Sequence, residues 1–217
     1  MNHPCRLSRR RLLTGSALAG LVLALASSAT VLAAPPPVKP GSPPPTFTLT
    51  SAAGARVSLA DFKGRTVVLE WTNHACPFVQ KHYSSNNMQN LQRDAKSAGV
   101  VWLSIISSAP GEQGAVSAEE ANRLTASRNA APAQVLFDPD GKVGRAYGAR
   151  ATPHMYVIAP DGRLAYMGAI DDRPGTDVAE IAGARNHVRE ALAELASGKP
   201  VSTPQTRAYG CAIKYAT

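Results

Sequence analysis

Runs of apolar residues divide most of the chain into short segments of strand or helix character. Strict alternation of apolar and polar residues marks two segments around a turn at Gly54, as in a β-hairpin. Two later runs are almost continuously apolar, which is typical of strands buried on both faces of a parallel sheet. The strands expected from these patterns span residues 46–49, 56–59, 66–71, 100–106, 135–137, 154–158 and 164–168.

Apolar residues at helical spacing alternate with these strands along the chain. Ser84-Ser85-Asn86-Asn87 interrupts the first helical region, so a break or kink is expected there. The helical segments expected are 77–98, 118–128, a short turn at 143–147, and 178–196. The resulting order is β-β-β-α-β-α-β-α-β-β-α, an α/β arrangement without an internal repeat or a phosphate-binding glycine loop.

The stretch from Val67 to Tyr83 carries the main chemical candidate. A strand and a short loop lead to Cys76, which is followed by Pro77, a residue favoured in the first turn of a helix. Free N–H groups and the helix dipole stabilise an anion there, so Cys76 is expected to be a reactive thiolate rather than a small buried hydrophobic residue. His74 either adds positive charge beside it or lies on the loop surface.

Residues 1–34 have the composition of a bacterial export signal. Four arginines precede an apolar run at 12–26, acidic residues are absent, and Val31-Leu32-Ala33 offers a cleavage site, with a cut expected near Ala33 or Ala34. The segment at 8–13 resembles a twin-arginine signature, although a general secretory signal and an uncleaved membrane anchor are alternatives. The expected location is the periplasm, with no membrane attachment after cleavage.

The remaining chain divides by composition into three parts. Residues 35–45 contain seven prolines and are expected to form an extended linker. Residues 46–198 form one domain, and 199–217 form a tail. After cleavage, 19 basic residues face 15 acidic ones, and no basic patch is interleaved with aromatic residues, so nucleic-acid binding is not expected.

Cysteine usage becomes informative once the signal is removed. Cys5 leaves with it, whereas Cys76 and Cys211 remain, an even number in an oxidising compartment. These two cysteines could form a structural disulfide, pair transiently in catalysis, or never meet. The spacing along the chain does not decide among the three.

The layout and three segments together resemble the thioredoxin fold and, more closely, its redoxin branch. The segment 59–69 is similar to the family's entry into its central strand, Cys76 falls at the redox cysteine, and Ala151-Thr152-Pro153 is similar to the segment that bears a cis-proline. This branch includes peroxiredoxins of the alkyl hydroperoxide reductase/thiol-specific antioxidant type and periplasmic thiol–disulfide proteins. The resemblance covers roughly residues 46–197 and implies a mixed central sheet flanked by helices, with an N-terminal β-hairpin extension and an extended C-terminal tail.

Two departures from the family patterns bear on activity. Thioredoxins carry Cys-x-x-Cys, whereas Val79 occupies the position of the second cysteine here. Peroxiredoxins carry Pro-x-x-x-Thr-x-x-Cys, whereas Thr72 lies four residues before Cys76 and the proline is absent. An exported thiol–disulfide oxidoreductase is therefore the first hypothesis, and a peroxide-reducing antioxidant is the second.

The resemblance assigns a role to each site residue. Cys76 is the nucleophile, and Cys211 either resolves the intermediate or forms a permanent disulfide that fixes the tail. Thr152 and Pro153, if the bond between them is cis, present backbone to a substrate. The expected partners are protein thiols or disulfides, or peroxide, together with an unidentified thiol electron donor; no cofactor is expected.

Four residues beside the cysteine are assigned supporting roles. Trp71 is expected to pack under the site. Glu70 is expected to relay protons to Cys76 or, alternatively, to be held by a nearby lysine or arginine. Thr72 and His74 complete the supporting set.

Two other classes of function remain open on the sequence. His74, Cys76, His82 and His154 combine thiolate and imidazole ligands, which suit copper or zinc, although related copper carriers have two closely spaced cysteines. A redox-inert binding module is the other class, and retention of function after Cys76→Ser would indicate it.

Overall fold

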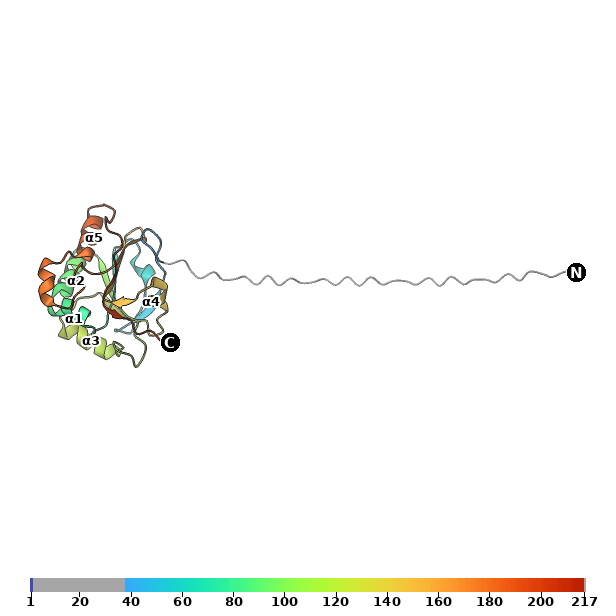
Figure 1. The fold of residues 1–217 in the computed structure, drawn as a ribbon, viewed down its shortest axis with the longest axis horizontal. Helices are drawn as coiled ribbons and strands as arrows, with labels where there is room; N and C mark the ends of the chain where they lie inside the picture. Colours follow the sequence, from blue (N-terminus) through green and yellow to red (C-terminus); the bar gives the residue numbers. More distant parts are fainter. Residues whose placement is uncertain (2–37, 217) are drawn as a thin grey trace. The chain divides into compact units, whose positions relative to one another are not determined.

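The computed structural model describes Met1 and residues 38–216, so the signal expected at 1–34 lies, apart from Met1, outside the described residues. Residues 38–216 are organised around a seven-stranded mixed β-sheet (Figure 1). Within the described residues, no helix has both the length and the apolar character needed to cross a membrane.

The centre of the sheet is parallel and its flanks are antiparallel. The strand order is β2-β1-β5-β4-β3-β7-β8, with β3 parallel to β4 and β4 parallel to β5. The strands are β1 (Thr48–Ser51), β2 (Arg56–Ser58), β3 (Val67–Trp71), β4 (Val101–Ile106), β5 (Gln134–Phe137), β7 (His154–Ile158) and β8 (Leu164–Gly168). The expected hairpin is confirmed by the antiparallel pairing of β1 with β2.

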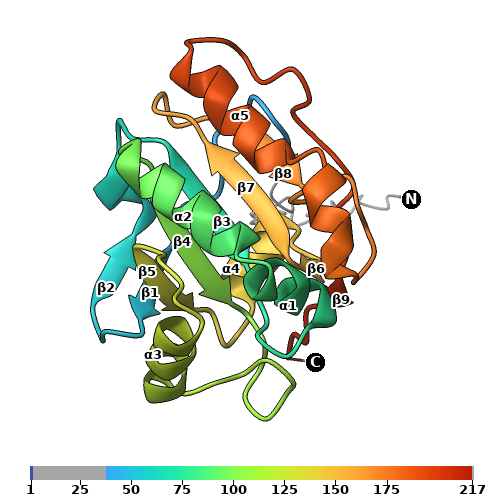
Figure 2. The ribbon, with the colours of Figure 1, turned by 90° about the vertical axis from the view of Figure 1, so that its left-hand side faces the viewer.

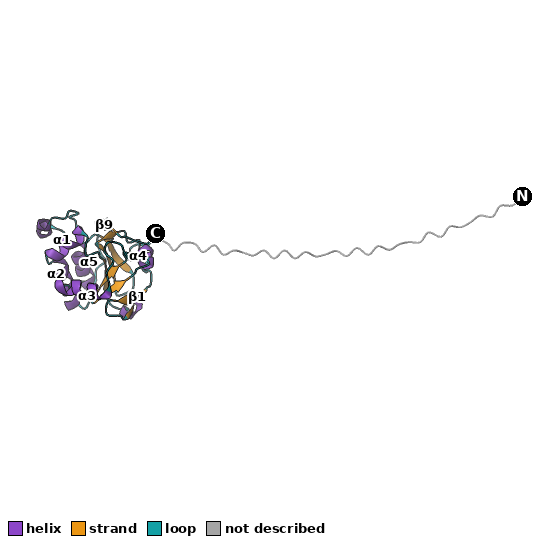
Figure 3. Cartoon of the chain, turned by 90° about the horizontal axis from the view of Figure 1, so that it is seen from below, coloured by secondary structure: helices purple, strands orange, loops and turns teal. Residues whose placement is uncertain are grey.

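Helices cover both faces of this sheet, as Figures 2 and 3 show. Helices α1 (Pro77–Ser84), α2 (Asn87–Ser97) and α5 (His187–Ala196) cover one face, whereas α4 (Lys142–Tyr147) lies on the other. Helix α3 (Ala118–Ser127) precedes β5. The mixed sheet and flanking helices confirm the thioredoxin-like α/β class.

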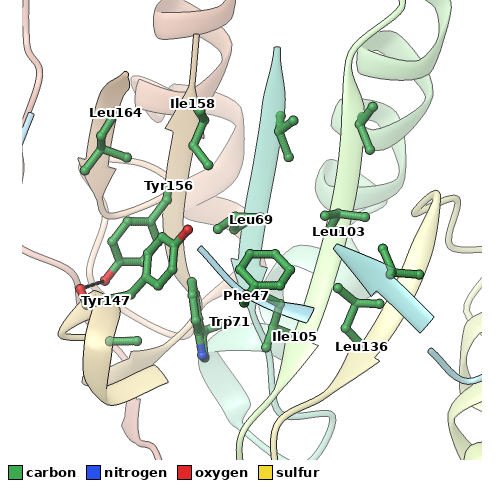
Figure 4. Close-up of a cluster of buried hydrophobic side chains, with 14 residues drawn as sticks. Phe47, Leu69, Trp71, Leu103, Ile105, Leu136, Tyr147, Tyr156, Ile158 and Leu164 are labelled. Carbon is green, nitrogen blue, oxygen red and sulfur yellow. Dashed lines mark hydrogen bonds between the residues drawn. The ribbon is translucent and has the colours of Figure 1, made fainter. Parts of the chain in front are cut away.

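Every side chain of β3 is buried, which explains its unbroken apolar run. Because neighbouring strand residues point to opposite faces, Val68 packs with the α1, α2 and α5 side, whereas Leu69 and Trp71 pack with the α4 side. On the α4 side, Trp71 lies against two tyrosine rings, with centroids 5.2 Å from Tyr147 and 5.0 Å from Tyr156 (Figure 4).

The break expected in the first helical region is confirmed between α1 and α2. Asn86 adopts a left-handed conformation with φ of 60°, so the helical backbone of α1 is interrupted and α2 begins at the next residue. The single helix expected at 178–196 is wrong. A 3-10 helix spans Val178–Gly183, and α5 begins separately after Asn186, whose side chain accepts the N–H of Arg189.

Residues 38–45 are bound to the domain rather than free of it. The N–H of Gly41 donates to the Leu164 carbonyl (2.8 Å), and the Leu164 N–H donates to the Ser42 carbonyl (3.0 Å). The Tyr147 hydroxyl donates to the Pro45 carbonyl at 2.7 Å. The prolines keep the segment extended, and the two bonds with Leu164 hold it against the first residue of β8.

The tail, residues 199–216, is extended as expected and follows the surface of the domain. Gln205 forms a bridge with Met167 of β8. The Thr206 hydroxyl lies 2.6 Å from the Tyr166 hydroxyl and accepts the Ala169 N–H at 2.9 Å. The first half of the tail is therefore attached to the edge of the sheet.

The second half of the tail is held at a different place. The Ala109 N–H donates to the Lys214 carbonyl at 2.7 Å, and the Tyr215 hydroxyl donates to the Ala149 carbonyl at 2.8 Å. Between the two attachments runs the short strand β9 (Cys211–Ala212), which pairs with β6 (Ala151–Thr152) beside the start of α1 (Figure 2).

Candidate active site

Cys76 occupies the N-cap of α1, with Pro77 as the first helical residue, as the sequence predicts. Its backbone is extended, and its carbonyl accepts the Gln80 N–H at 2.9 Å, which starts the helix. The residue has an exposed fraction of 0%, so its sulfur cannot be reached from solvent in this conformation.

The Thr152–Pro153 segment lies against this sulfur. The Thr152–Pro153 peptide bond is cis, and the Cys76 thiol donates a hydrogen bond to the Thr152 carbonyl at 3.1 Å. The two residues are 76 positions apart in sequence. The loop before β7 therefore forms one wall of the site.

The tail brings Cys211 to the same place. Thr152 and Cys211 are register partners in the antiparallel pair of β6 and β9. The Cys76 and Cys211 side chains lie close enough for each to shift the pKa of the other, and both cysteines are free rather than joined in a disulfide. A residue near the C-terminus thus supplies the second thiol that the Cys-x-x-Val tetrad lacks.

Glycine is required immediately before Cys211. Gly210 has a φ of 134°, and a Cβ at this position would overlap the carbonyl oxygen of Thr152. The absence of a side chain lets the tail backbone approach the wall formed by Thr152 and brings the next residue over Cys76.

The two thiols have opposite tendencies to ionise. Burial acts to raise the pKa of Cys76, but hydrogen bonds from the Cys211 and Thr152 side chains and from backbone N–H groups outweigh it and lower that pKa below the ordinary thiol value. Burial, followed by the hydrogen bond and charge of Cys76, raises the pKa of Cys211 to about 11. Cys76 is therefore the thiol of the pair that loses its proton more readily.

Tyr209 anchors the tail two residues before Cys211. Its hydroxyl donates to Asp171 Oδ1 at 2.5 Å and lies 3.1 Å from His82 Nε2, and its ring packs edge-on against Phe78 with centroids 6.0 Å apart. Since the hydroxyl proton goes to Asp171, His82 donates through Nε2 and accepts from Asn87 through Nδ1 (2.9 Å). Burial lowers the pKa of His82 to about 4, which agrees with a neutral ring.

Lys81 is a second buried polar residue beside the site. Its ammonium group donates to the carbonyls of Arg173 (2.7 Å) and Gly175 (3.1 Å) and to Glu180 Oε2 (2.9 Å). Lys81 thus fixes the segment after β8 onto α1. Sequence reasoning assigned no role to Lys81, Asp171 or Tyr209, because their partners are distant in sequence; the run Lys81-His82-Tyr83, polar where a buried helix face is expected, was the available signal.

Glu70 does not contact Cys76. Its oxygens accept hydrogen bonds from four side chains on the face of the sheet that α1, α2 and α5 cover, and no lysine or arginine is among these donors. The donors are Tyr83 (2.9 Å), Gln92 (3.3 Å), Trp102 (2.8 Å) and Ser104 (2.9 Å). These bonds join α1 and α2 to β4, so neither role expected for this carboxylate matches its contacts.

The other three supporting residues lie around the site without bonding to the cysteine. Trp71 belongs to the core on the α4 face, whereas Cys76 packs on the opposite face, and the indole N–H donates to Ser107 at 3.0 Å. The Thr72 hydroxyl is buried, with no hydrogen-bond partner among the described residues. His74 is partly buried, and burial, followed by the charge of Arg128, lowers its pKa.

The four residues considered as metal ligands are engaged separately. His82 contacts Tyr209 and Asn87, whereas the His154 ring packs against Tyr156 with centroids 4.6 Å apart. Within the part of the chain that the structure describes, no three His, Cys, Asp or Glu side chains are grouped to hold a metal ion.

Solved structures with the same fold include two proteins of similar size. The chain is 28% identical to an uncharacterized conserved protein from Geobacillus kaustophilus, with a TM-score of 0.70 over 82% of this chain and 93% of the other. It is 25% identical to a hypothetical protein from Sinorhizobium meliloti 1021, with a TM-score of 0.70 over 83% and 96%. A proposed thiol:disulfide interchange protein, DsbE, from Chlorobium tepidum is 21% identical, with a TM-score of 0.55 over 73% and 99%, which shows the fold alone.

Among curated proteins, none matches the chain significantly. The family model for Redoxin matches residues 39–184, about two thirds of the sequence and almost all of the sheet. This match confirms the resemblance inferred from Cys76, Thr152 and Pro153, and the chain belongs to the Redoxin family.

Proposed function

We propose that this protein is a thiol–disulfide oxidoreductase in which Cys76 is the nucleophile and Cys211 the resolving cysteine. The observation that carries the proposal is that both cysteines meet at Thr152, whose carbonyl accepts the Cys76 thiol at 3.1 Å and whose backbone pairs with Cys211. Members of the Redoxin family are usually thiol oxidoreductases, and the lowered pKa of Cys76 supplies the thiolate such chemistry requires.

The reaction needs both cysteines in sequence. The Cys76 thiolate attacks a substrate disulfide, forming a mixed disulfide and releasing one substrate thiolate. Cys211 then loses its proton and attacks the Cys76 sulfur, which releases the second substrate thiolate and leaves a Cys76–Cys211 disulfide. Two electrons pass from the protein to the substrate, and a thiol donor must later return them.

Access to the buried nucleophile requires movement of the tail. Cys76 is fully covered, and Cys211 is only half-buried, so the backbone around Gly210 must move away before a substrate disulfide reaches the sulfur. The pairing of β6 with β9 involves only two residues on each strand, so few bonds oppose this opening.

Peroxide is the second candidate oxidant, favoured by the same lowered pKa of Cys76. The Cys76 thiolate would then become a sulfenic acid, and Cys211 would displace water to form the same disulfide. Disulfide chemistry ranks first because the buried Thr72 hydroxyl has no partner among the described residues and makes no bond to Cys76 that could help polarise a peroxide.

Mass spectrometry of alkylated protein tests the proposal and separates the two oxidants. We expect reduced wild-type protein treated with 2-hydroxyethyl disulfide to form a Cys76–Cys211 disulfide, and Cys211→Ser to stop at a mixed disulfide on Cys76. Faster formation of the internal disulfide with hydrogen peroxide, and a sulfenic acid in Cys211→Ser, would favour the peroxidase. A Cys76 thiol unmodified by either oxidant would overturn both.

Export to the periplasm is part of the same proposal, and it rests on the composition of residues 1–34. A dithiol that cycles through a disulfide suits an oxidising compartment. Cell fractionation and N-terminal sequencing of the protein expressed in a bacterium test it: cleavage near Ala33 or Ala34 is expected, and an intact cytosolic chain would contradict it.

A further inference from the structure

A hollow lies beside the tail, lined by tail residues and by residues on both sides of the cis-proline segment. Its volume is about 570 Å³, within the range of small-molecule sites. Arg150, His154, Gln205 and Arg207 contribute to its lining, and no acidic residue does. One wall therefore comes from the residues that flank β6, and the other comes from the tail.

The two arginines of this hollow have no ionic partner. Within the described residues, neither the Arg150 nor the Arg207 guanidinium has a carboxylate within 4.0 Å, and neither donates a recorded hydrogen bond. By contrast, Arg185 pairs with Glu190 at 2.7 Å. Residues 2–37 and Thr217, which lie outside the described residues, contain no Asp or Glu side chain.

The buried imidazole in the wall is suited to an anion as a neutral hydrogen-bonding group. Burial, followed by the charge of Arg150, lowers the pKa of His154 to about 4. Arg150 is therefore close enough to the ring for its charge to act on it, and the hollow combines two unpaired guanidinium groups with a neutral imidazole. Planar guanidinium groups of this kind bind carboxylates in paired hydrogen bonds.

The hollow is also adjacent to the redox pair along both walls. Arg150 is two residues before Thr152, whose carbonyl contacts Cys76, and its own carbonyl accepts the Ile213 N–H at 3.2 Å. Arg207 is four residues before Cys211, which is at most about 14 Å along an extended chain. Neither cysteine lines the hollow, so a small molecule bound by its anionic end at the arginines would have to extend out of it to bring a sulfur to the half-buried Cys211.

We propose that this hollow binds the carboxylate of a low-molecular-weight thiol, the electron donor that reduces the Cys76–Cys211 disulfide; the inference rests on the proposed function. The donor thiolate attacks Cys211, the sulfur more exposed in the reduced structure, and the bond to Cys76 breaks with its electron pair leaving as the Cys76 thiolate, the better leaving group. A second donor thiolate attacks the donor sulfur of the mixed disulfide. Cys211 leaves and takes a proton, and the donor is released as its disulfide.

The reverse reaction provides the test, because the same site must accept the donor's disulfide. Reduced protein is mixed with three disulfides of matched skeleton: 3,3′-dithiodipropionate, a dianion; 2-hydroxyethyl disulfide, which is neutral; and cystamine, a dication. The rate of Cys76–Cys211 formation is compared between wild type and Arg150→Gln/Arg207→Gln. The variant is expected to be about tenfold slower with the dianion, unchanged with the neutral compound, and equal or faster with the dication.

A charge-matched control separates local binding from general attraction. Arg56→Gln/Lys63→Gln removes the same charge at two exposed positions that do not line the hollow; Arg56 belongs to β2, at the opposite edge of the sheet from β8. This variant should react like wild type with all three disulfides. An equal slowing of the dianion in both double variants would assign the effect to net charge and overturn the site.

A binding measurement keeps the inference separate from the proposed function. Suberate has the chain length of dithiodipropionate but no sulfur, so its calorimetric titration reports the site without redox chemistry. Wild type should bind it, and Arg150→Gln/Arg207→Gln should lose most of that affinity. No suberate binding to wild type would overturn the site, whereas binding without reaction toward any disulfide would instead overturn the redox function.

Discussion

Thr152 contacts both redox candidates, since its carbonyl accepts the Cys76 thiol at 3.1 Å and its backbone is the register partner of Cys211. A single residue of the cis-proline segment thus sets the positions of two cysteines that are 135 positions apart in the numbering. Any change that shifts this pairing should alter both the ionisation of Cys76 and its access to reagents.

The thiol of Cys211 is expected to stabilise the Cys76 thiolate. In Cys211→Ala, the interaction with the Cys211 side chain is lost, so the pKa of Cys76 should rise and its thiolate fraction at pH 7 should fall. In Cys211→Ser, the hydroxyl can still donate, so the rise should be smaller. The pH dependence of thiolate absorbance measures this shift without interference from changed access.

Equal pKa values of Cys76 in the alanine and serine variants would show that the side chain at 211 does not stabilise the thiolate. The Thr152 side chain and the backbone N–H groups of Val79 and Cys211 would then account for the lowered pKa. Thiolate absorbance from Cys211 itself is absent in both variants. Subtracting the same titration of the corresponding double variants with Cys76→Ser removes the tyrosine absorbance, so the remaining signal belongs to Cys76.

Gly210→Ala should displace the tail from the site. The added Cβ overlaps the Thr152 carbonyl, so β9 cannot keep its pairing with β6. Cys76 should then be alkylated faster by iodoacetamide, and the Cys76–Cys211 disulfide should form more slowly. Both rates can be followed by mass spectrometry of quenched samples.

Gly54→Ala is the matched control for this change. Gly54 also has a positive φ, 80°, but no atom lies within 4 Å of the position of its Cβ. It should therefore bear only the backbone cost, about 1–2 kcal/mol, and leave both cysteine rates unchanged. Equal effects of the two alanine variants on alkylation would contradict the proposed close approach at Gly210.

Removal of the Tyr209 hydroxyl should weaken the attachment of the tail before Cys211. Tyr209→Phe leaves Asp171 buried without its 2.5 Å donor, at a cost of about 1–3 kcal/mol. Faster alkylation of Cys76 is expected, because the tail opens more often. Tyr215→Phe removes the hydrogen bond from the Tyr215 hydroxyl to the Ala149 carbonyl, on the other side of Cys211. The alkylation rates of the two variants show which attachment limits access to Cys76.

The result decides which half of the tail moves. If the alkylation rate of Cys76 rises strongly in Tyr209→Phe and only slightly in Tyr215→Phe, the tail opens in the part before Cys211. The reverse order would place it after Cys211. Alkylation of Cys76 at the wild-type rate in both variants would show that neither hydroxyl limits access.

Long patterned segments of the fold were predictable from sequence, and short ones were not. The fully buried run of β3 and the break before α2 are visible in apolar spacing and in Ser84-Ser85-Asn86-Asn87. The two-residue strands β6 and β9 are too short to show any period. The separation of the 3-10 helix at Val178–Gly183 from α5 depends on Asn186, which caps α5 and also forms an isolated β-bridge with Asp171.

The candidate site shows the same division between local and distant signals. The placement of Cys76 at a helix N-terminus follows from the proline after it. The contact between Tyr209 and His82 joins residues 127 positions apart, and the contact with Asp171 spans 38, so no local pattern could reveal either. The contacts of Glu70 were misjudged because its four donors come from separate elements.

Glu70→Gln separates a structural role from a proton relay. In this variant an amide NH2 group takes the place of one carboxylate oxygen, so at least one of the four donors loses its acceptor. The free energy of unfolding should fall by about 3 kcal/mol. The pH profile of Cys76 alkylation should stay unchanged. A shifted profile in this variant, with stability retained, would restore the relay.

Acid should destabilise the protein through two buried histidines. Burial is the main cause that lowers the pKa of both His82 and His154 to about 4. At His82 the charge of Asp171 opposes this shift and that of Lys81 adds to it. At His154 the charge of Arg150 adds to it. Below the ordinary value near 6.5, the unfolded chain binds a proton at each histidine and the folded chain does not, so stability is present above that pH and is lost as the pH falls toward 4. Each contributes a slope of about 1.4 kcal/mol per pH unit at most.

Denaturant unfolding at pH 7, 6 and 5 measures this slope, and single variants assign it. His82→Gln and His154→Gln should each be less stable than wild type at pH 7 but lose less stability on acidification, because one of the two protons is no longer taken up. His74→Gln, at a partly buried position, should flatten the curve less. A slope that persists in both buried-site variants would mean that carboxylates, rather than these imidazoles, govern acid unfolding.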